Sequence, residues 1–447
     1  MLRVTALNRP RTSLLTDHYE LTMVQAALAG GHAERRCVFE AFARRLPEGR
    51  RYGVVAGTGR FLESLADFTF EEEEITFLRD TGVVNEQTLE WLASYRFTGD
   101  IWGYAEGECY FPGSPLLIVE STFAEGVILE TLALSILNYD SAVAAAASRM
   151  TATAGERPCI EMGSRRTHEG SAVAAARAAY IAGFGSTSNL EAGRTHGIPT
   201  LGTAAHSFTL LHDSEREAFA AQLTGLGLNT TLLVDTYDVT AAVELAVELA
   251  GPELGGVRLD SGDLVSQAHE VRAQLDALGA TDTKIVVTSD LDEFAIAALQ
   301  AAPVDAYGVG TRVVTGSGAP AAGLVYKLVA REGADGELVG VAKESQDKGS
   351  VGGRKHALRR RNITGVAHEE RIGIGVAPQD DGDDRDLLVQ LVRAGEVIVP
   401  TDARTAREHH VRSRTELPTK GLRLSHGDPA VRTVFEDEQS RTEVEED

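Results

Sequence analysis

Cysteines, long apolar runs and positive charges are all scarce in this chain of 447 residues, and each shortage excludes a class of protein. The three cysteines, Cys37, Cys109 and Cys159, form no CxxC pair, which argues against a disulfide framework and a cysteine-rich zinc site. No run of about 18 apolar residues is unbroken, so we expect no membrane span. The N-terminal residues also lack the apolar core of a signal peptide. We therefore expect a soluble, cytoplasmic protein with reduced thiols.

The shortage of positive charge bears on the partners. Lys and Arg number 43 against 66 Asp and Glu, which gives a net charge of -23. This charge repels a nucleic-acid backbone at long range, so we expect no nucleic-acid partner. A small phosphorylated ligand remains compatible, because a few local Arg, Lys and backbone N–H groups decide its binding.

Length and shifts in composition predict the domain organisation. At about 150 residues per domain, the chain holds two or three domains. Residues 1–125 mix short helical and strand-like patterns, and residues 126–334 form an α/β domain that begins with Ala-rich helices. Residues 335–425 are Gly-rich and charged, and residues 426–447 have the composition of an acidic, solvated tail.

Short apolar runs alternate with helical segments in the α/β domain. The runs TTLLVD, GGVRLD and TKIVVTSD end at Asp235, Asp260 and Asp290, and a further run, VDAYGVGT, follows. This alternation indicates βαβ units on a parallel sheet, with three aspartates at the edge where ligands bind. The alternative is that each aspartate only caps its following helix. The three together favour a site.

The run VDAYGVGT contains Gly308, Gly310 and Thr311 at its end, where a glycine backbone can approach a phosphate. A dinucleotide site would need a third glycine and a helix directly after it, whereas Val313 starts another apolar stretch. A phosphate site on a late strand of a barrel fits better.

A histidine and three arginines supply further chemistry. His206, in GTAAHS, is flanked by small residues and precedes the strand that ends at Asp235, whose carboxylate can fix the imidazole tautomer. A lone histidine is more often structural. Arg165, Arg166 and Arg258 carry guanidinium groups that match carboxylate or phosphate oxygens, although surface ion pairs are the commoner role of arginine.

Ten motifs in order carry a family resemblance. They are LLTDHYELTM, FEAFARRLP, SRRTHEG, GFGSTSN, GTAAHS, LLVDTYD, RLDSGD, DAYGVGT, VYKL and GGRK, between about residues 14 and 356. The set resembles nicotinate phosphoribosyltransferase. The resemblance implies an irregular, TIM-like α/β barrel, a second mixed α/β domain built from the N- and C-terminal segments, and a homodimer with shared active sites. It also implies that nicotinate and 5-phosphoribosyl-1-pyrophosphate give nicotinate mononucleotide and pyrophosphate, with Mg²⁺ and with ATP hydrolysis through a phosphohistidine.

The resemblance also implies residue roles. His206 would be phosphorylated and Asp235 would orient it. Arg258 would hold the base or phosphates, Asp260 would hold the ribose hydroxyls, and Tyr19 would stack on the pyridine ring from the partner subunit.

The remaining implied residues form two sets. Arg165, Thr187 and Ser261 complete the substrate-binding set, and the phosphate-binding set is Gly308, Gly310, Thr311, Lys327, Arg354 and Lys355. No residue is assigned as a metal ligand. Met162 stands where many relatives have an aromatic residue, and a thioether can pack on a ring face.

Three alternatives remain, and a fourth, the other phosphoribosyltransferase fold, does not match. A nicotinamide-specific phosphoribosyltransferase would differ in how the ring substituent is read, and a quinolinate phosphoribosyltransferase would not need the ATP-linked histidine. The loop of the other phosphoribosyltransferase fold needs adjacent acids, whereas Asp235 and Asp238 are separated. A non-catalytic nucleotide-binding module would show no ATP turnover.

Overall fold

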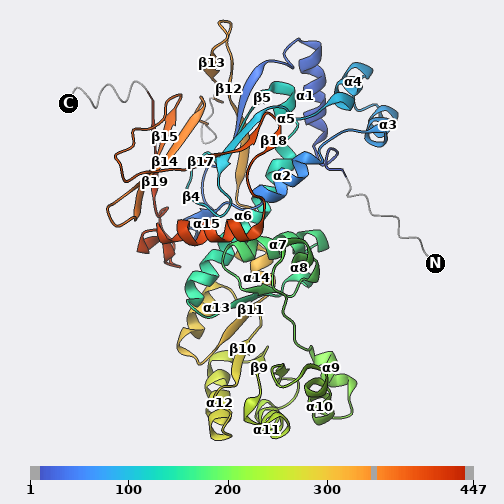
Figure 1. Ribbon diagram of the computed structural model, residues 1–447, viewed down its shortest axis with the longest axis vertical. Coiled ribbons are helices and arrows are strands. Elements are labelled where there is room, and N and C mark those ends of the chain that lie inside the picture. The colour runs from blue at the N-terminus through green and yellow to red at the C-terminus, as the bar shows by residue number, and fades with distance from the viewer. Residues whose placement is uncertain (1–10, 344–349, 438–447) are drawn as a thin grey trace. The chain divides into compact units, whose positions relative to one another are not determined.

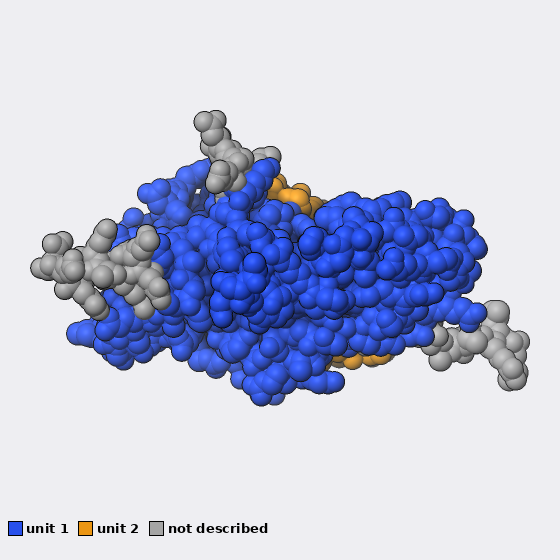
Figure 2. Space-filling model, turned by 90° about the horizontal axis from the view of Figure 1, so that it is seen from above, with its two compact units in different colours: residues 1–141, 321–447 blue, residues 142–320 orange. Residues whose placement is uncertain are grey.

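The computed structural model describes residues 11–343 and 350–437, and the chain divides into two compact units (Figures 1 and 2). Unit 1 combines residues 1–141 with 321–447, and unit 2 is residues 142–320. The division falls within the helix α6 (Glu130–Ala154). Residues 126–141 and 321–334, which the composition assigned to the α/β domain, therefore belong to unit 1.

A six-stranded parallel sheet forms the centre of unit 2, in the order β7-β6-β11-β10-β9-β8. Its strands are β6 (Cys159–Glu161), β7 (Ser186–Thr187), β8 (Thr231–Leu233), β9 (Gly256–Leu259), β10 (Lys284–Val287) and β11 (Ala306–Val309). Most of their residues are buried, which explains why the strands appear in the sequence as continuous apolar runs. The four strands expected from the sequence, β8 to β11, are confirmed.

Helices follow the strands, as βαβ units require. They are α7 (Glu169–Ile181), α8 (Leu190–His196), α9 (His206–Leu211), α10 (Glu215–Leu226), α11 (Val239–Ala250), α12 (Leu264–Ala277), α13 (Glu293–Ala298) and α14 (Thr311–Val314). Figure 1 shows α11 and α12 at one end of unit 2, where they pack against each other. The four-residue helix α14 begins where the sequence had predicted another apolar stretch.

The helix caps decide between the two interpretations of the strand-end aspartates. Asp238, Asp263 and Asp292 cap α11, α12 and α13, each accepting a hydrogen bond from a backbone N–H in the first turn. The caps therefore lie two or three residues beyond Asp235, Asp260 and Asp290. The strand-end carboxylates are not used as caps.

The parallel sheet does not close among the described strands, so a TIM-like barrel is not confirmed. An isolated bridge between Thr187 and Thr200 extends the pairing one step beyond β7. Residues 201–205 then form no helix or strand, and β8 remains the other edge of the sheet. The architecture of the chain is mixed α/β with several sheets.

Unit 1 is built on a seven-stranded sheet in the order β13-β12-β1-β5-β3-β17-β18. All its pairs are antiparallel, and β1 pairs with β12 on one side and β5 on the other. The strands are β1 (Arg36–Ala43), β3 (Asp100–Tyr104), β5 (Leu117–Thr122), β12 (Leu324–Glu332), β13 (Leu338–Gly340), β17 (Leu388–Arg393) and β18 (Glu396–Val397).

A four-stranded sheet and a two-stranded sheet complete unit 1. The first contains β14 (Lys355–Arg361), β15 (Ala367–Ile374), β16 (Arg385–Asp386) and β19 (Arg432–Glu436), and the second pairs β2 (Gly53–Val54) with β4 (Cys109–Tyr110). Strand β19 lies in the segment assigned from its charge to an acidic tail. It pairs in parallel with β15, where Glu369 binds Arg432, so its acidity does not prevent pairing. Residues 438–447 of that segment lie outside the described residues.

The helices of unit 1 are α1 (His18–Ala29), α2 (Thr58–Ala66), α3 (Glu72–Thr81), α4 (Glu86–Ser94), α5 (Phe123–Val127) and α15 (Ala403–Thr415). The stretch Phe123–Ala154, which contains α5 and α6, is long and apolar enough to cross a membrane, with a mean hydropathy of 1.3 over its most apolar 18 residues. Of that window, 67% is buried within the chain, as in a core helix.

Candidate active site

A cavity of about 500 Å³ lies in unit 2, at the edge where the parallel strands end. Its walls come from residues at or directly after the ends of β6, β7, β9, β10 and β11, together with the irregular segment 201–205 and the first residue of α9. The lining combines three arginines with two of the strand-end aspartates and a histidine. Because the carboxyl edge of a parallel sheet gathers loops distant in sequence, this is the place where the fold can assemble a site.

His206 is the first residue of α9 and faces the cavity with its side chain 39% exposed. Its Nδ1 lies 3.1 Å from Oγ1 of Thr236, and its Nε2 lies 3.9 Å from Oδ1 of Asp235 and 4.0 Å from Oδ2 of Asp260. Thr236 therefore fixes the orientation of the ring through a hydrogen bond. Asp235, the expected orienting residue, lies beyond hydrogen-bond distance of Nε2.

Asp235 joins two loops at this edge. Its Oδ2 accepts hydrogen bonds from the backbone N–H of Asp260 at 2.9 Å and from the hydroxyl of Ser261 at 2.7 Å. Its Oδ1 is buried and has no hydrogen-bond partner among the described residues. An unsatisfied carboxylate oxygen beside a cavity is costly unless a ligand or ion uses it. Thr288 donates a hydrogen bond to Asp260 and orients that carboxylate.

Arg258 lies on β9 and lines the cavity. One terminal nitrogen donates to the hydroxyl of Thr203 at 2.6 Å, while its Nε is buried without a hydrogen-bond partner among the described residues. Burial lowers the pKa of Arg258, Asp260 and Asp235 raise it by less, and the nearby Arg165 lowers it further. The guanidinium group therefore has donors that an anionic ligand can accept from.

Arg165 and Arg166 occupy a short 3-10 turn, Ser164–Arg166, directly after β6. Glu161, at the end of β6, holds this turn: its two oxygens accept hydrogen bonds from the N–H of Gly163 and from the hydroxyl of Thr187. Burial raises the pKa of Glu161, and these two hydrogen bonds oppose the shift. Motif reasoning had assigned Glu161 no role, because its contacts join two different loops.

Gly308, near the end of β11, and Gly310 and Thr311, directly after it, all line the cavity. A Cβ on Gly308 would lie 2.5 Å from a methyl carbon of Thr288 and 2.9 Å from the sulfur of Met162, so close packing against these side chains requires glycine there. A Cβ on Gly310 would meet only the carbonyl oxygen of Met162, at 3.5 Å. Gly310 therefore leaves the backbone accessible from the cavity.

Comparison with known proteins identifies the family. The profile of the nicotinate phosphoribosyltransferase (NAPRTase) N-terminal domain matches residues 14–138. The chain is 55% identical to the nicotinate phosphoribosyltransferase pncB1 of Mycobacterium tuberculosis, over 95% of this chain and 96% of that protein. The chain belongs to the nicotinate phosphoribosyltransferase family.

Two further relatives agree. The nicotinate phosphoribosyltransferase of Bacillus subtilis is 38% identical over 78% of this chain and 73% of its own length. The crystal structure of human nicotinic acid phosphoribosyltransferase superposes with a TM-score of 0.80 and 27% identity, covering 97% of this chain and 99% of the human one. The resemblance found from the motifs is confirmed, and the chain is an enzyme with nicotinate phosphoribosyltransferase activity.

Two residues that the family resemblance placed in the substrate site do not line the cavity. Thr187 is fully buried, and its hydroxyl donates to Glu161 and accepts from the N–H of Asn189, whereas the next residue, Ser188, does line the cavity. Ser261 binds Asp235 instead. Thr187 holds Glu161 and Ser261 holds Asp235, so both side chains contact residues that do not themselves line the cavity.

Four other residues implied by the family resemblance belong to unit 1 and have partners there. Lys327 and Arg354 lie 3.4 Å from Glu130 and 3.0 Å from Glu120, respectively. Lys355 is buried in an ion pair with Glu40 at 2.9 Å, so its charge is already neutralised. Tyr19 is 46% exposed, and burial together with Glu130 and Glu20 raises its pKa to about 12.

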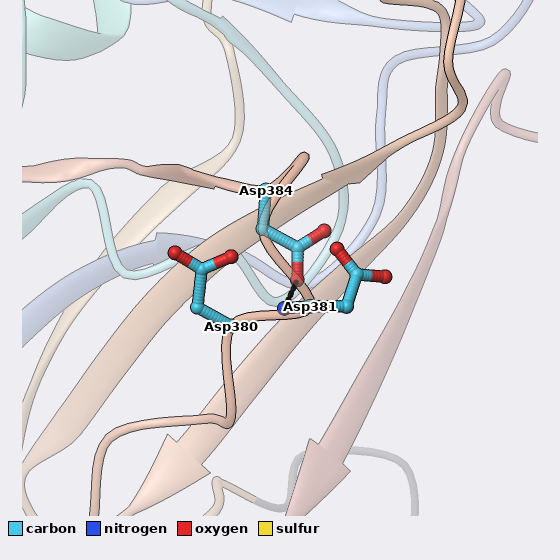
Figure 3. Close-up of side chains that lie close together, drawn as sticks. All are labelled: Asp380, Asp381 and Asp384. Atoms are coloured by element: carbon cyan, nitrogen blue, oxygen red, sulfur yellow. Dashed lines mark hydrogen bonds between the residues drawn. The ribbon is translucent and has the colours of Figure 1, made fainter.

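One group of carboxylates in the described part of the chain has oxygens within 4.8 Å of one another: Asp380, Asp381 and Asp384, before β16 in unit 1 (Figure 3). The dashed line in Figure 3 is the 3.3 Å hydrogen bond from the N–H of Asp381 to Asp384. Arg360 lies 3.7 Å from Asp381 and 3.2 Å from Asp384 and neutralises part of this charge. We assign no metal to this loop.

The sequence did not indicate several residues that contribute to the cavity. Thr203 binds Arg258, Thr288 binds Asp260, and Ser188 and Ser289 line the wall. Thr203 belongs to the GTAAHS motif, and Thr288 and Ser289 stand immediately before Asp290. Their nearness to predicted site residues was the one feature of the sequence that could have identified them.

Proposed function

We propose that this enzyme transfers the 5-phosphoribosyl group to nicotinate in the cavity of unit 2 and couples the transfer to ATP hydrolysis through a phosphohistidine at His206. One observation carries the proposal. Three arginines, two strand-end carboxylates and a partly exposed histidine meet in one cavity of about 500 Å³, in a chain whose net charge is otherwise strongly negative.

In this reaction the ring nitrogen of nicotinate forms a bond to C1 of the pentose of 5-phosphoribosyl-1-pyrophosphate. The bond from C1 to the pyrophosphate oxygen breaks, and pyrophosphate leaves with that electron pair. Arginines suit the nicotinate carboxylate and the phosphate oxygens. The carboxylates of Asp260 and Asp290 suit the pentose hydroxyls and the positive charge that develops on the sugar.

Mg²⁺ fits the same edge of the sheet. Asp260 and Asp290 offer carboxylate oxygens to the cavity, and Asp235 has a buried oxygen without a hydrogen-bond partner. Hard oxygen donors together with substrate phosphates are the usual surroundings of Mg²⁺. The ion would neutralise charge on the departing pyrophosphate.

The histidine geometry supports phosphorylation at Nε2. Nδ1 is engaged by Thr236, which leaves Nε2 facing the cavity. The Nε2 lone pair would form the N–P bond as the γ-phosphoryl bond to ADP breaks, and water would later hydrolyse the phosphohistidine. Such a cycle drives transfer only if it changes the affinity of the site for substrates or products.

We also propose the irregular barrel for unit 2. The Thr187–Thr200 bridge carries the pairing beyond β7. Beyond this bridge, side-chain hydrogen bonds join the segment 203–206 to the other edge of the sheet. Thr203 binds Arg258 of β9, and His206 binds Thr236 after β8. These two contacts support a barrel whose last gap is joined by side chains rather than by a backbone ladder.

The homodimer with shared active sites and the cytoplasmic location remain proposals. Among the described residues, no Phe, Tyr or Trp lines the cavity of unit 2, whereas the side chain of Tyr19 is partly exposed, which supports ring stacking by a tyrosine from a second subunit. All three cysteines are buried and unpaired, which supports a reducing compartment.

Product analysis tests the proposed function. Purified protein receives 5-phosphoribosyl-1-pyrophosphate with nicotinate or nicotinamide, with and without ATP. We expect nicotinate mononucleotide, in higher yield when ATP is present, and acid-labile labelling of the protein by γ-³²P-ATP. His206→Ala should lose the labelling and the ATPase activity and keep some ATP-independent transfer. Full labelling of that variant would exclude His206, and a preference for nicotinamide would overturn the substrate assignment.

A further inference from the structure

Ser289 has an unusual backbone conformation directly beside the cavity. Its φ is 131°, in the region that favours glycine, and only Ser317 and Ala394 share a positive φ among the described residues other than glycine. Ser289 lines the cavity, while the other two do not. A strained residue other than glycine at a binding site points to a use for its side chain.

The conformation is fixed by the residues on both sides. Before Ser289, the N–H of Thr288 donates to the carbonyl of Leu259 at 2.8 Å, and its hydroxyl donates to Asp260. After Ser289, the N–H of the buried Leu291 donates back to the carbonyl of Ser289 at 2.8 Å, and Asp292 caps α13. Glycine would take this turn without strain, so the fold does not require a serine.

The hydroxyl of Ser289 makes no hydrogen bond within the described part of the chain, and the residue is exposed to the cavity. The position of Ser289 in the sheet indicates which part of a bound ligand its hydroxyl contacts. Strand β10 lies between β11, which contains Gly308 and is followed by Gly310, and β9, which contains Arg258. A ligand that reaches from the glycine loop to Arg258 must pass over the end of β10.

We infer that Ser289 is a substrate-binding residue whose hydroxyl bonds a pentose hydroxyl of 5-phosphoribosyl-1-pyrophosphate. The inference rests on the proposed function, which places the 5-phosphate at Gly308 and Gly310 and the base near Arg258. The pentose is the part of that substrate between these two groups. A serine hydroxyl both donates and accepts, so it complements the alcohols of a sugar better than a phosphate that already has arginines nearby.

Two variants separate the hydroxyl from the strain. Ser289→Ala keeps a Cβ in the strained conformation and removes only the hydroxyl, whereas Ser289→Gly removes both. We expect each variant to lower kcat/KM for 5-phosphoribosyl-1-pyrophosphate by about 3- to 10-fold, the effect of one lost neutral hydrogen bond. The KM for nicotinate should not change. Ser289→Gly alone should raise the Tm of unit 2, by about 1–4 °C.

Deoxy substrates identify the bond. With the 2-deoxy or 3-deoxy analogue that lacks the bonded alcohol, Ser289→Ala should cost no further activity. An alanine variant with wild-type kinetics would overturn the inference. Loss in the glycine variant alone would also overturn it, because flexibility and not the hydroxyl would then be responsible.

Ala394→Gly provides the matched control, because Ala394 has a φ of 48° in unit 1 and has no hydroxyl. It should leave the kinetics unchanged. The wild-type protein separates this inference from the proposed function. If it makes no nicotinate mononucleotide, the proposed function fails, whereas normal turnover with a silent Ser289→Ala variant rejects only the role of Ser289.

Discussion

Two arginines in the two units have opposite surroundings. Arg359, on β14 of unit 1, is fully buried, and its terminal nitrogens bind Glu108, Glu370 and the carbonyl oxygen of Cys109. Arg258, on β9 of unit 2, binds only the hydroxyl of Thr203 and has no carboxylate within ion-pair distance among the described residues.

The pKa values of the two guanidinium groups shift in opposite directions. Burial lowers the pKa of Arg359, but Glu108 and Glu370 raise it more, so it lies well above the usual value. Burial lowers the pKa of Arg258, and Asp260 and Asp235 do not restore it. A paired buried charge stabilises one arrangement of unit 1, whereas an arginine without a carboxylate partner keeps its donors for a ligand.

Removing Arg359 should have the largest effect. Arg359→Met leaves Glu108 and Glu370 buried without their main partner, and we expect the free energy of unfolding of unit 1 to fall by about 3–5 kcal/mol. Urea denaturation followed by circular dichroism measures this loss. Arg404→Met is the control, since Arg404 is 82% exposed beside Glu408 and should change stability by about 0.5 kcal/mol or less. Equal effects of the two variants would contradict the comparison.

Removing Arg258 should affect activity and leave stability nearly unchanged. Arg258→Met should lower kcat/KM for nicotinate by about 10²-fold, since charge-assisted hydrogen bonds to the carboxylate are lost, and should lower nicotinamide turnover far less. Steady-state kinetics with both bases measures this, with the exposed Arg216→Met as the control. The same series on Arg165→Met assigns the carboxylate: a larger loss there would transfer that role from Arg258 to Arg165.

The smallest expected effect concerns a neutral group beside the paired network. Burial lowers the pKa of His410 to about 4, while its Nδ1 binds the carbonyl oxygen of Gly107 at 2.9 Å. His410 therefore binds a proton near pH 6.5 in the unfolded chain but only near pH 4 in the folded chain. Stability is lost as pH falls through this window, by about 2 kcal/mol between pH 6.5 and 5.

Urea denaturation of the wild type and His410→Asn at pH 7 and pH 5 tests this sign. The stability advantage of the wild type should shrink at pH 5, because asparagine takes up no proton. A constant difference would show that His410 titrates alike in both states.

The sequence predicted the features that depend on neighbouring residues. The parallel strands β8 to β11 were recognisable because a buried strand is a short apolar run between helical segments. Asp235, Asp260 and Asp290 were correctly distinguished from simple helix caps, since three strand ends carried the same residue type. The family followed from the order of ten motifs, each weak alone.

Other features depend on residues far apart and left no local signal. Glu108 and Arg359 meet although 251 positions separate them, so the charge network of unit 1 was not visible in the sequence. The pairing of Lys355 with Glu40 likewise changed a residue expected at a phosphate into a buried ion pair. The motif VYKL lies in β12, and nothing in it indicated that this segment pairs with β1 of unit 1.

The pairing of β1 with β12 has a consequence for synthesis. Strand β1 ends at Ala43 and β12 begins at Leu324, so 280 residues lie between the two strands (323 minus 43). At about 5–20 residues per second, the ribosome needs roughly 14–56 s to supply the partner strand. Unit 2 is continuous in sequence and is complete by residue 320, whereas β1 keeps an open edge until β12 emerges. The nascent chain therefore completes the cavity of unit 2 before the sheet of unit 1, and it exposes a strand to aggregation during that interval.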